Sequence, residues 1–297
     1  MGIAELWPLV TLAATAAQTG RNALQRHLTP VTGTLGATYA RFLFGLPFAA
    51  GLLGALRLAS GRPLPMPQGA SLLFMAAGGL TQILATALML RAMKQKSFVV
   101  TIAYTKTEPV LVALFSLVFL GLRPSLATLV AIGLATCGVL LMSWPKTRTE
   151  QTYRPAMLGL ASAAFFALSA LLFQQGILRL EAHSPFMAAA TGLALALVLQ
   201  SLMILFWSSL RDRASLARLA AAWRLALLAG FLGALASLFW FLGFALTSAT
   251  NVRTLAMVEV IFAQIVSRRL FQQGVSQREG VGIVLLMAGI GLLLHAA

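Results

Sequence analysis

Two glutamates lie inside long apolar stretches of this 297-residue chain and divide it in a regular way. Glu108 and Glu259 are 151 residues apart. The same spacing recurs between two pairs of glycines, Gly138 with Gly289 and Gly79 with Gly230. A carboxylate in the hydrocarbon core of a bilayer is costly and is by default either functional or ion-paired. The spacing therefore predicts a duplicated membrane protein in which each half carries one acid within a membrane-spanning segment.

The composition excludes a water-soluble globular protein. Hydrophobic residues make up 59% of the chain and charged residues 10%, and the mean hydropathy is +0.88. About a quarter of the residues of a soluble domain are charged. The net charge of +15 arises largely in short loops between apolar stretches, without a basic face or an aromatic platform for nucleic acid. We therefore expect an integral membrane protein that binds no nucleic acid.

Few residues of the chain could support a metal centre or catalysis. Cys137 is the one cysteine, and His27, His183 and His295 are scattered near the ends of apolar stretches. One thiol forms neither an internal disulfide nor a redox pair. The polar and charged residues deep within the apolar stretches include no histidine, no serine paired with a base and no metal-ligand cluster. The sequence predicts no cofactor, no metal and no enzymatic activity.

Ten apolar segments have about the 20 residues that a helix needs to cross a bilayer. The expected spans of the first half are 3–24, 31–56, 69–92, 98–121 and 124–143. Those of the second half are 155–178, 184–208, 225–247, 250–271 and 277–296. A polar linker at 145–154 separates the expected units 1–144 and 155–297. Five is an odd number, so the halves have opposite orientations, and we expect an all-α fold of two inverted five-helix repeats.

The charges of the loops indicate an orientation in the membrane. Loops after the odd-numbered spans hold 14 Lys and Arg residues, whereas those after the even-numbered spans hold four. The positive-inside rule places the richer loops in the cytoplasm. Both termini are then expected on the non-cytoplasmic side of the cell inner membrane. Because two halves are fused in one chain, we expect a monomer.

The fourth expected span combines a polar face with a proline. Residues at spacings of three and four place four polar side chains on one helix face: Thr101, Tyr104, Thr105 and Glu108. Pro109 removes a backbone donor and is expected to act as a hinge that kinks the helix and frees the carbonyl of Thr105. The ninth span has Glu259 at the equivalent position but lacks the proline. A polar face beside a kink is typical of a ligand pocket.

Basic residues also lie within the expected spans. Lys106 is about 200° around the helix from Glu108, at about 100° per residue, so these two are not expected to pair. Glu108 either titrates or binds during transport, or it pairs with Arg41 and locks two helices together. Arg21 and Arg253 lie near span ends, where their side chains are expected to reach the interface.

Further polar side chains could line a cavity between the halves. The candidate substrate-binding or coupling residues are Gln18, Asn22, Arg41, Gln82, Tyr104, Thr105, Lys106, Glu108, Trp240 and Glu259. Hydroxyl groups in membrane helices mostly bond to their own or a neighbouring helix, so each also has a structural interpretation. Trp240 lies at mid-span, where it forms either a wall for a substrate or part of the packed core.

The chain resembles the EamA-type ten-helix transporters of the drug/metabolite transporter superfamily. The resemblance covers nearly the whole chain. It rests on the two five-span halves, their closing spans with Gly138 and Gly289, and the stretches Thr107-Glu108-Pro109-Val110 and Ala40-Arg41-Phe42-Leu43. The second half repeats the Glu-Pro motif as Glu259-Val260, without its proline. The resemblance implies a secondary transporter with a central cavity, similar in fold to the aromatic amino acid exporter branch. Such exporters are usually described with cytoplasmic termini, which is opposite to the orientation that the loop charges indicate here.

The residues and the resemblance together predict a carrier of small metabolites that works by alternating access. Amino acids or related zwitterions are the favoured substrates, with export as the direction. A substrate carboxylate would suit Arg41 or Lys106. The alternatives are proton-coupled efflux of cationic or aromatic drugs, with Glu108 or Glu259 as the anionic partner, and flipping of lipids.

Overall fold

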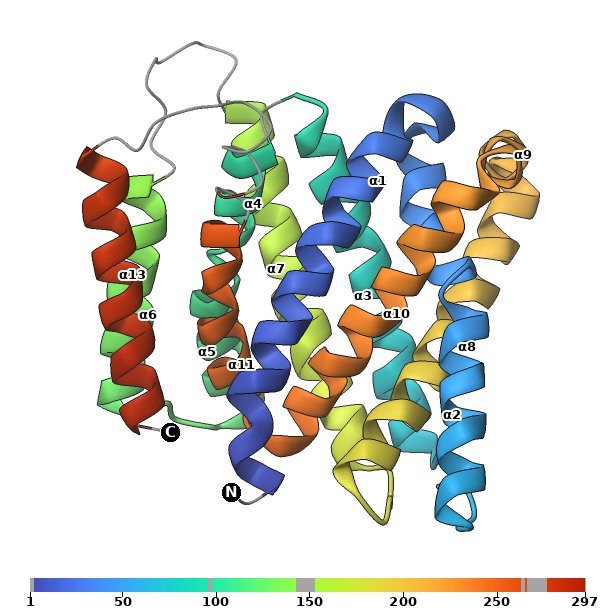
Figure 1. Ribbon diagram of the computed structural model, residues 1–297, viewed down its shortest axis with the longest axis horizontal. Helices are drawn as coiled ribbons and strands as arrows, with labels where there is room; N and C mark the ends of the chain where they lie inside the picture. Colours follow the sequence, from blue (N-terminus) through green and yellow to red (C-terminus); the bar gives the residue numbers. More distant parts are fainter. Residues whose placement is uncertain (1–2, 96–97, 143–152, 263–264, 266–276, 297) are drawn as a thin grey trace.

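The chain folds into a bundle of helices that run alongside one another, with both termini at the same edge (Figure 1). The computed structural model describes residues 3–95, 98–142, 153–262, 265 and 277–296, and these contain helices, turns and loops but no strand. The first half consists of η1 (Ile3–Leu6), α1 (Trp7–Leu43), α2 (Leu46–Ser60), α3 (Gly69–Met93), α4 (Phe98–Thr105), α5 (Glu108–Leu120) and α6 (Leu126–Met142). The second half consists of α7 (Tyr153–Leu178), α8 (Pro185–Arg211), α9 (Arg213–Ala221), α10 (Trp223–Leu246), α11 (Ala249–Leu255), η3 (Ala256–Val258) and α13 (Gln277–Ala296). Most of the expected linker, residues 145–152, lies outside the described residues.

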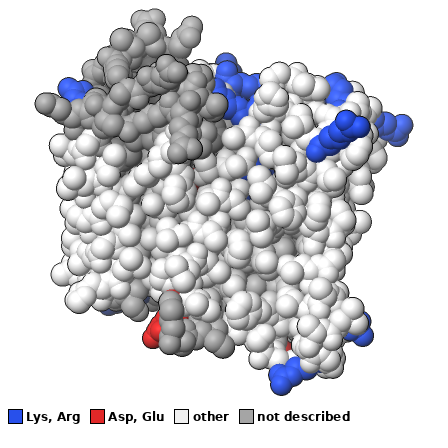
Figure 2. All heavy atoms as spheres, viewed as in Figure 1, with Lys and Arg blue, Asp and Glu red and all other residues white. Residues whose placement is uncertain are grey.

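The helices have the length and apolarity of a multi-pass membrane protein. Five described segments are long and apolar enough to cross a bilayer: Trp7–Ser60, Gly69–Met93, Arg154–Leu178, Pro185–Arg211 and Trp223–Leu246. Shorter apolar helices cover Glu108–Leu120, Leu126–Leu141 and Gly280–His295. Lys and Arg gather at the upper and lower ends of the visible face, with a largely uncharged band between them (Figure 2). Such a band suits contact with lipid tails.

The expected boundary between the first two spans is wrong. The helix continues through residues 25–30, and the chain folds back at Gly33, whose φ of 78° lies in the left-handed region that favours glycine. Polar side chains in this stretch are satisfied locally, which allows the helix to continue. The Thr29 hydroxyl donates to the Gln25 carbonyl at 2.7 Å, and the Gln25 amide donates to the Ala37 carbonyl across the turn at 2.8 Å.

Each of the two intramembrane glutamates follows a break in its helix. The kink expected at Pro109 is a full interruption, since α4 ends at Thr105 and α5 begins at Glu108. Proline is well tolerated in the first turn of a helix, where its missing N–H has no partner to lose. In the second half, α11 ends at Leu255 and the 3-10 turn η3 leads to Glu259 without any proline. The two halves therefore share a broken helix at equivalent positions.

The two halves interlock through pairs of helices. α1 packs along α10, α3 along α7, and α6 along α13, so each pair joins the first half to the second. In the α3–α7 interface, the hydroxyls of Ser71, Ser162 and Ser169 donate to backbone carbonyls of the facing helix at 2.8–3.0 Å. The cavity described below lies within this interlocked core.

The contact between α6 and α13 repeats itself with the 151-residue spacing. A Cβ atom on Gly138 would lie 2.5 Å from the carbonyl oxygen of Gly282, so only glycine fits there. A Cβ atom on Gly289 would lie 2.7 Å from the carbonyl oxygen of Ala131. Positions 131 and 282 are themselves 151 residues apart. The two contacts therefore involve positions related by the same spacing as the two glutamates.

Candidate functional site

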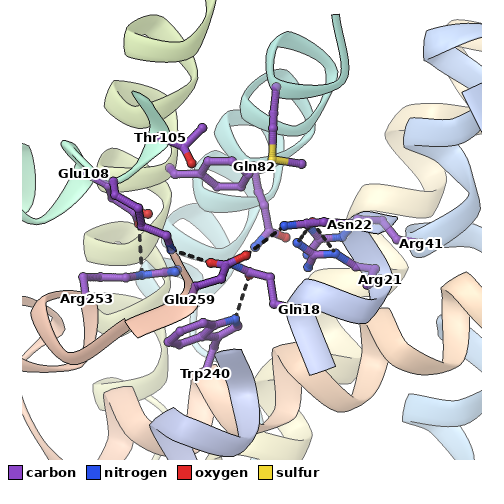
Figure 3. Close-up of a pocket in the computed structure, with 13 residues that line it drawn as sticks. Gln18, Arg21, Asn22, Arg41, Gln82, Thr105, Glu108, Trp240, Arg253 and Glu259 are labelled. Atoms are coloured by element: carbon purple, nitrogen blue, oxygen red, sulfur yellow. Dashed lines mark hydrogen bonds and ion pairs between the residues drawn. The ribbon is translucent and has the colours of Figure 1, made fainter. Parts of the chain in front are cut away.

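A small polar cavity lies among α1, α3, α7, α10 and the two broken helices (Figure 3). Its lining consists of Gln18, Arg21, Asn22, Arg41, Gln82, Met89, Thr105, Lys106, Glu108, Phe166, Trp240, Arg253 and Glu259. The free volume is about 10 Å³, which is roughly what one water molecule needs. A larger substrate would therefore enter only after these side chains move.

Glu259 is held by donors from the first half of the chain. Its Oε2 atom accepts hydrogen bonds from Lys106 Nζ and from Gln18 Nε2, the latter at 2.8 Å. Its Oε1 atom accepts from Asn22 Nδ2 at 3.0 Å (Figure 3). The side chain is 1% exposed. The bilayer cost of this buried carboxylate is thus offset by one cation and two amide donors.

Glu108 pairs with Arg253 of the second half. Arg253 Nε lies 3.0 Å from Glu108 Oε1, but the pair lacks the angles of a good hydrogen bond, so charge carries this contact. The Arg253 guanidinium also lies over the rings of Trp240 and Phe244, at 4.4 and 5.2 Å from their centroids. Glu108 occupies the first turn of α5, where the positive end of the helix dipole favours an anion.

The two ion pairs cross between the halves. The acid of each half is paired with a base from the other half, Glu259 with Lys106 and Glu108 with Arg253. The expectation that Lys106 does not pair with Glu108 agrees with this arrangement. The alternative in which Glu108 pairs with Arg41 is wrong. Since both pairs bridge the broken helices, any separation of the halves at the cavity requires them to open.

Nine of the ten expected site residues line this cavity, and Tyr104 does not. Tyr104 packs instead against Gly159 of α7. A Cβ atom on Gly159 would lie only 2.6 Å from the Cβ atom of Tyr104, so the absence of a side chain there leaves room for the tyrosine. The Trp240 indole N–H donates to Gln18 Oε1 at 3.0 Å, and its ring forms one wall (Figure 3). The Thr105 hydroxyl donates to the Ile102 carbonyl of its own helix at 2.7 Å, which is the structural interpretation given above.

The predicted location of two lining arginines is wrong. Arg21 and Arg253 were expected to reach the membrane interface, but they are 1% and 5% exposed and contribute to the cavity. Arg21 lies mid-way along the part of α1 that precedes Gly33, because this part continues beyond the expected end at residue 24. Arg253 lies deep because α11 ends two residues later and the chain turns through η3. Met89 and Phe166 were also missed, since apolar side chains in a span carry no distinguishing signal.

The lining holds four bases and two acids. Besides the two ion-paired bases, it contains Arg21 and Arg41, which meet neutral partners. Arg21 Nε and Nη2 donate to Asn22 Oδ1 at 3.2 and 2.7 Å. Arg41 donates to hydroxyls of α3 and α10 at 3.3 and 3.4 Å. The part of the chain that the structure describes contains no group of three or more His, Cys, Asp or Glu residues that could hold a metal ion.

Comparison with known protein families gives a match over both halves. The model of the EamA-like transporter family matches residues 6–144 and 154–295. The chain belongs to the EamA-like transporter family. Members of this family are membrane transporters of small molecules rather than enzymes. The membership agrees with the family resemblance seen in the sequence, while the finer likeness to aromatic amino acid exporters stays a prediction.

The solved structures agree on the fold of this EamA-like chain. One structure, described as "Crystal structure of protein", has a TM-score of 0.62 and 14% sequence identity. The superposition covers 96% of this chain and 99% of the other. At this identity the likeness shows the fold alone. A comparison with curated proteins gives no match.

Proposed function

We propose that this protein is a secondary transporter that exports small metabolites bearing a carboxylate, foremost amino acids or related zwitterions, across the cell inner membrane. The observation that carries the proposal is the cavity at the crossed ion pairs, where buried bases outnumber acids. Arg41 has only long hydrogen bonds to hydroxyls. Arginine forms stronger, often bidentate, hydrogen bonds with a carboxylate. A substrate carboxylate would therefore be a better partner for Arg41 than the present ones.

Transport would proceed by alternating access between two inverted repeats of five spans. The family match falls on two ranges separated by the expected linker, and the α6–α13 contact repeats with the same spacing as the glutamates. Both observations support the repeats. Many carriers hold their substrate between such repeats, at broken helices near the middle of the membrane. The crossed ion pairs would close the site on one side and open as the halves rock.

The termini would lie outside the cytoplasm. Both chain ends are at one edge of the bundle (Figure 1), and the exposed basic residues Arg91, Arg211 and Arg213 lie at the ends of helices that reach the opposite edge. The positive-inside rule favours the cytoplasm for the more basic edge. This placement supports the orientation that the loop charges indicate. The fused halves suit a monomer.

Counterflow in proteoliposomes tests the proposed function. Purified protein is reconstituted, the liposomes are preloaded with a mixture of amino acids, and labelled amino acids are added one at a time outside. Transient accumulation of at least one amino acid, absent from protein-free liposomes, is expected. If folded protein accumulates cationic drugs or flips a labelled lipid but exchanges no amino acid, the proposal is wrong and the corresponding alternative replaces it.

A further inference from the structure

The two arginines without an acid partner occupy the same corner of the cavity. Gly233 of α10 faces both of them, because a Cβ atom there would lie 3.1 Å from Arg41 Cβ and 3.5 Å from Arg21 Cδ. Both side chains are almost fully buried. Within the described residues, neither has a carboxylate within ion-pair distance. We call Arg21 and Arg41 the arginine pair.

One guanidinium nitrogen of the arginine pair is free to bind a ligand. Two nitrogens of Arg21 are occupied by Asn22 Oδ1, while the buried Nη1 atom has no hydrogen-bond partner in the described part of the chain. The amide nitrogen of Asn22 donates to Glu259. Asn22 therefore fixes Arg21 in place through a neutral group, and no acid among the described residues pairs with Arg21 directly.

The acids of the cavity are not available to the arginine pair. Glu259 already accepts from Lys106, Gln18 and Asn22, and Glu108 is paired with Arg253. Arginine stays protonated in proteins, and an unpaired buried charge is unfavourable. The lining as a whole carries four positive and two negative charges. A ligand with net negative charge restores the balance, whereas a zwitterion adds no net charge.

We propose that the arginine pair is an anion subsite and that the substrate is an acidic small molecule, a dicarboxylate or an acidic amino acid, rather than a neutral zwitterion. This inference rests on the proposed function and narrows its substrate class. The first carboxylate binds between Arg21 and Arg41. The second carboxylate offsets the remaining excess of positive charge in the lining. The preference for an acidic ligand over a neutral zwitterion therefore arises from charge and not from size.

Aspartate and asparagine provide a matched pair of probes, because they have nearly the same shape and differ by one charge. Thermal unfolding of the purified protein in detergent is measured against increasing L-aspartate, L-asparagine and succinate, since a bound ligand raises the midpoint. Aspartate and succinate are expected to be more potent than asparagine. Each should raise the unfolding midpoint by a given amount at a concentration at least 10-fold lower than asparagine needs. Equal potency of asparagine, or no shift with either acid, overturns the inference.

Variants of Arg21 connect the preference to the arginine pair. Arg21→Gln is expected to reduce the aspartate-to-asparagine preference to less than 3-fold, and Arg21→Lys to retain most of it because the charge remains. Arg57→Gln removes the same charge at an exposed position of α2 and is expected to leave the preference unchanged. If Arg57→Gln lowers the preference as much as Arg21→Gln, long-range charge explains it and the subsite assignment is wrong.

The same probes separate this inference from the proposed function. Counterflow of labelled asparagine as fast as that of labelled aspartate contradicts the inference but leaves an amino acid carrier. Selective binding of aspartate without counterflow of aspartate or succinate supports the anion subsite but contradicts the transport function.

Discussion

Replacing Glu259 by alanine is expected to abolish transport and to lower the free energy of unfolding by about 3–5 kcal/mol, the usual effect of removing one partner of a buried ion pair. Lys106 would be left as a buried cation without a counter-ion. Gln18 and Asn22 would each lose the acceptor of an amide hydrogen bond. Thermal unfolding in detergent measures the stability, and counterflow measures transport.

Two further variants make this prediction specific. Glu181→Ala removes an exposed acid that bonds to Gln68, and a surface change of this kind shifts stability by about 0.5 kcal/mol or less. Glu259→Ala combined with Lys106→Met removes both charges, so it is expected to recover most of the stability but not transport. A Glu259→Ala protein as stable as Glu181→Ala would show that the crossed ion pair does not hold the halves together.

Arg41→Ala is expected to reduce counterflow by about 100-fold, to background, because truncating a buried group that pairs with a charged ligand costs about 2–5 kcal/mol. Expression and thermal stability are expected to stay close to those of the unmodified protein. Arg41 has no acid partner among the described residues and makes only long hydrogen bonds to Thr86 and Ser237. Removing Arg41 therefore removes the energetic cost of an unpaired buried charge. This gain in stability offsets the packing that is lost with the side chain.

The control for this variant is Arg57→Ala, which removes an exposed arginine from the same half and is expected to transport normally. Arg41→Lys keeps the charge but not the planar fork, so partial transport with weaker substrate binding is expected. Transport by Arg41→Ala at the level of Arg57→Ala would exclude Arg41 from the substrate site.

Much of the cavity could be predicted from the sequence because polar groups are rare in membrane spans and need each other as partners. Glu108, Glu259 and Lys106 could be found for this reason alone. The pairing could not be predicted, since it depends on where two broken helices face each other. Helical spacing indicated only that Lys106 and Glu108 point in different directions.

The breaks themselves differ in how visible they are in the sequence. Pro109 marks the interruption before α5, whereas η3 has no proline, and its turn depends on the surrounding packing. The reversal at Gly33 is equally hidden, because glycine is frequent in membrane helices. These turns set the depth of Arg21 and Arg253, and this is why the sequence pattern alone predicts an interfacial position for both.

The central claim is that one cavity opens to either side of the membrane in turn, and sided chemical labelling tests it most directly. Cys137 is the only cysteine of the chain, so a Cys137→Ala background allows one new thiol at a time. Thr105→Cys places it in the cavity lining, and Ser60→Cys at an exposed end of α2 serves as the control. A membrane-impermeant thiol reagent is added to either face of oriented vesicles. The cavity thiol is expected to react from both faces and more slowly with substrate, while the control reacts from one face. Reaction of the cavity thiol from a single face, in protein that still transports, would contradict alternating access through this site.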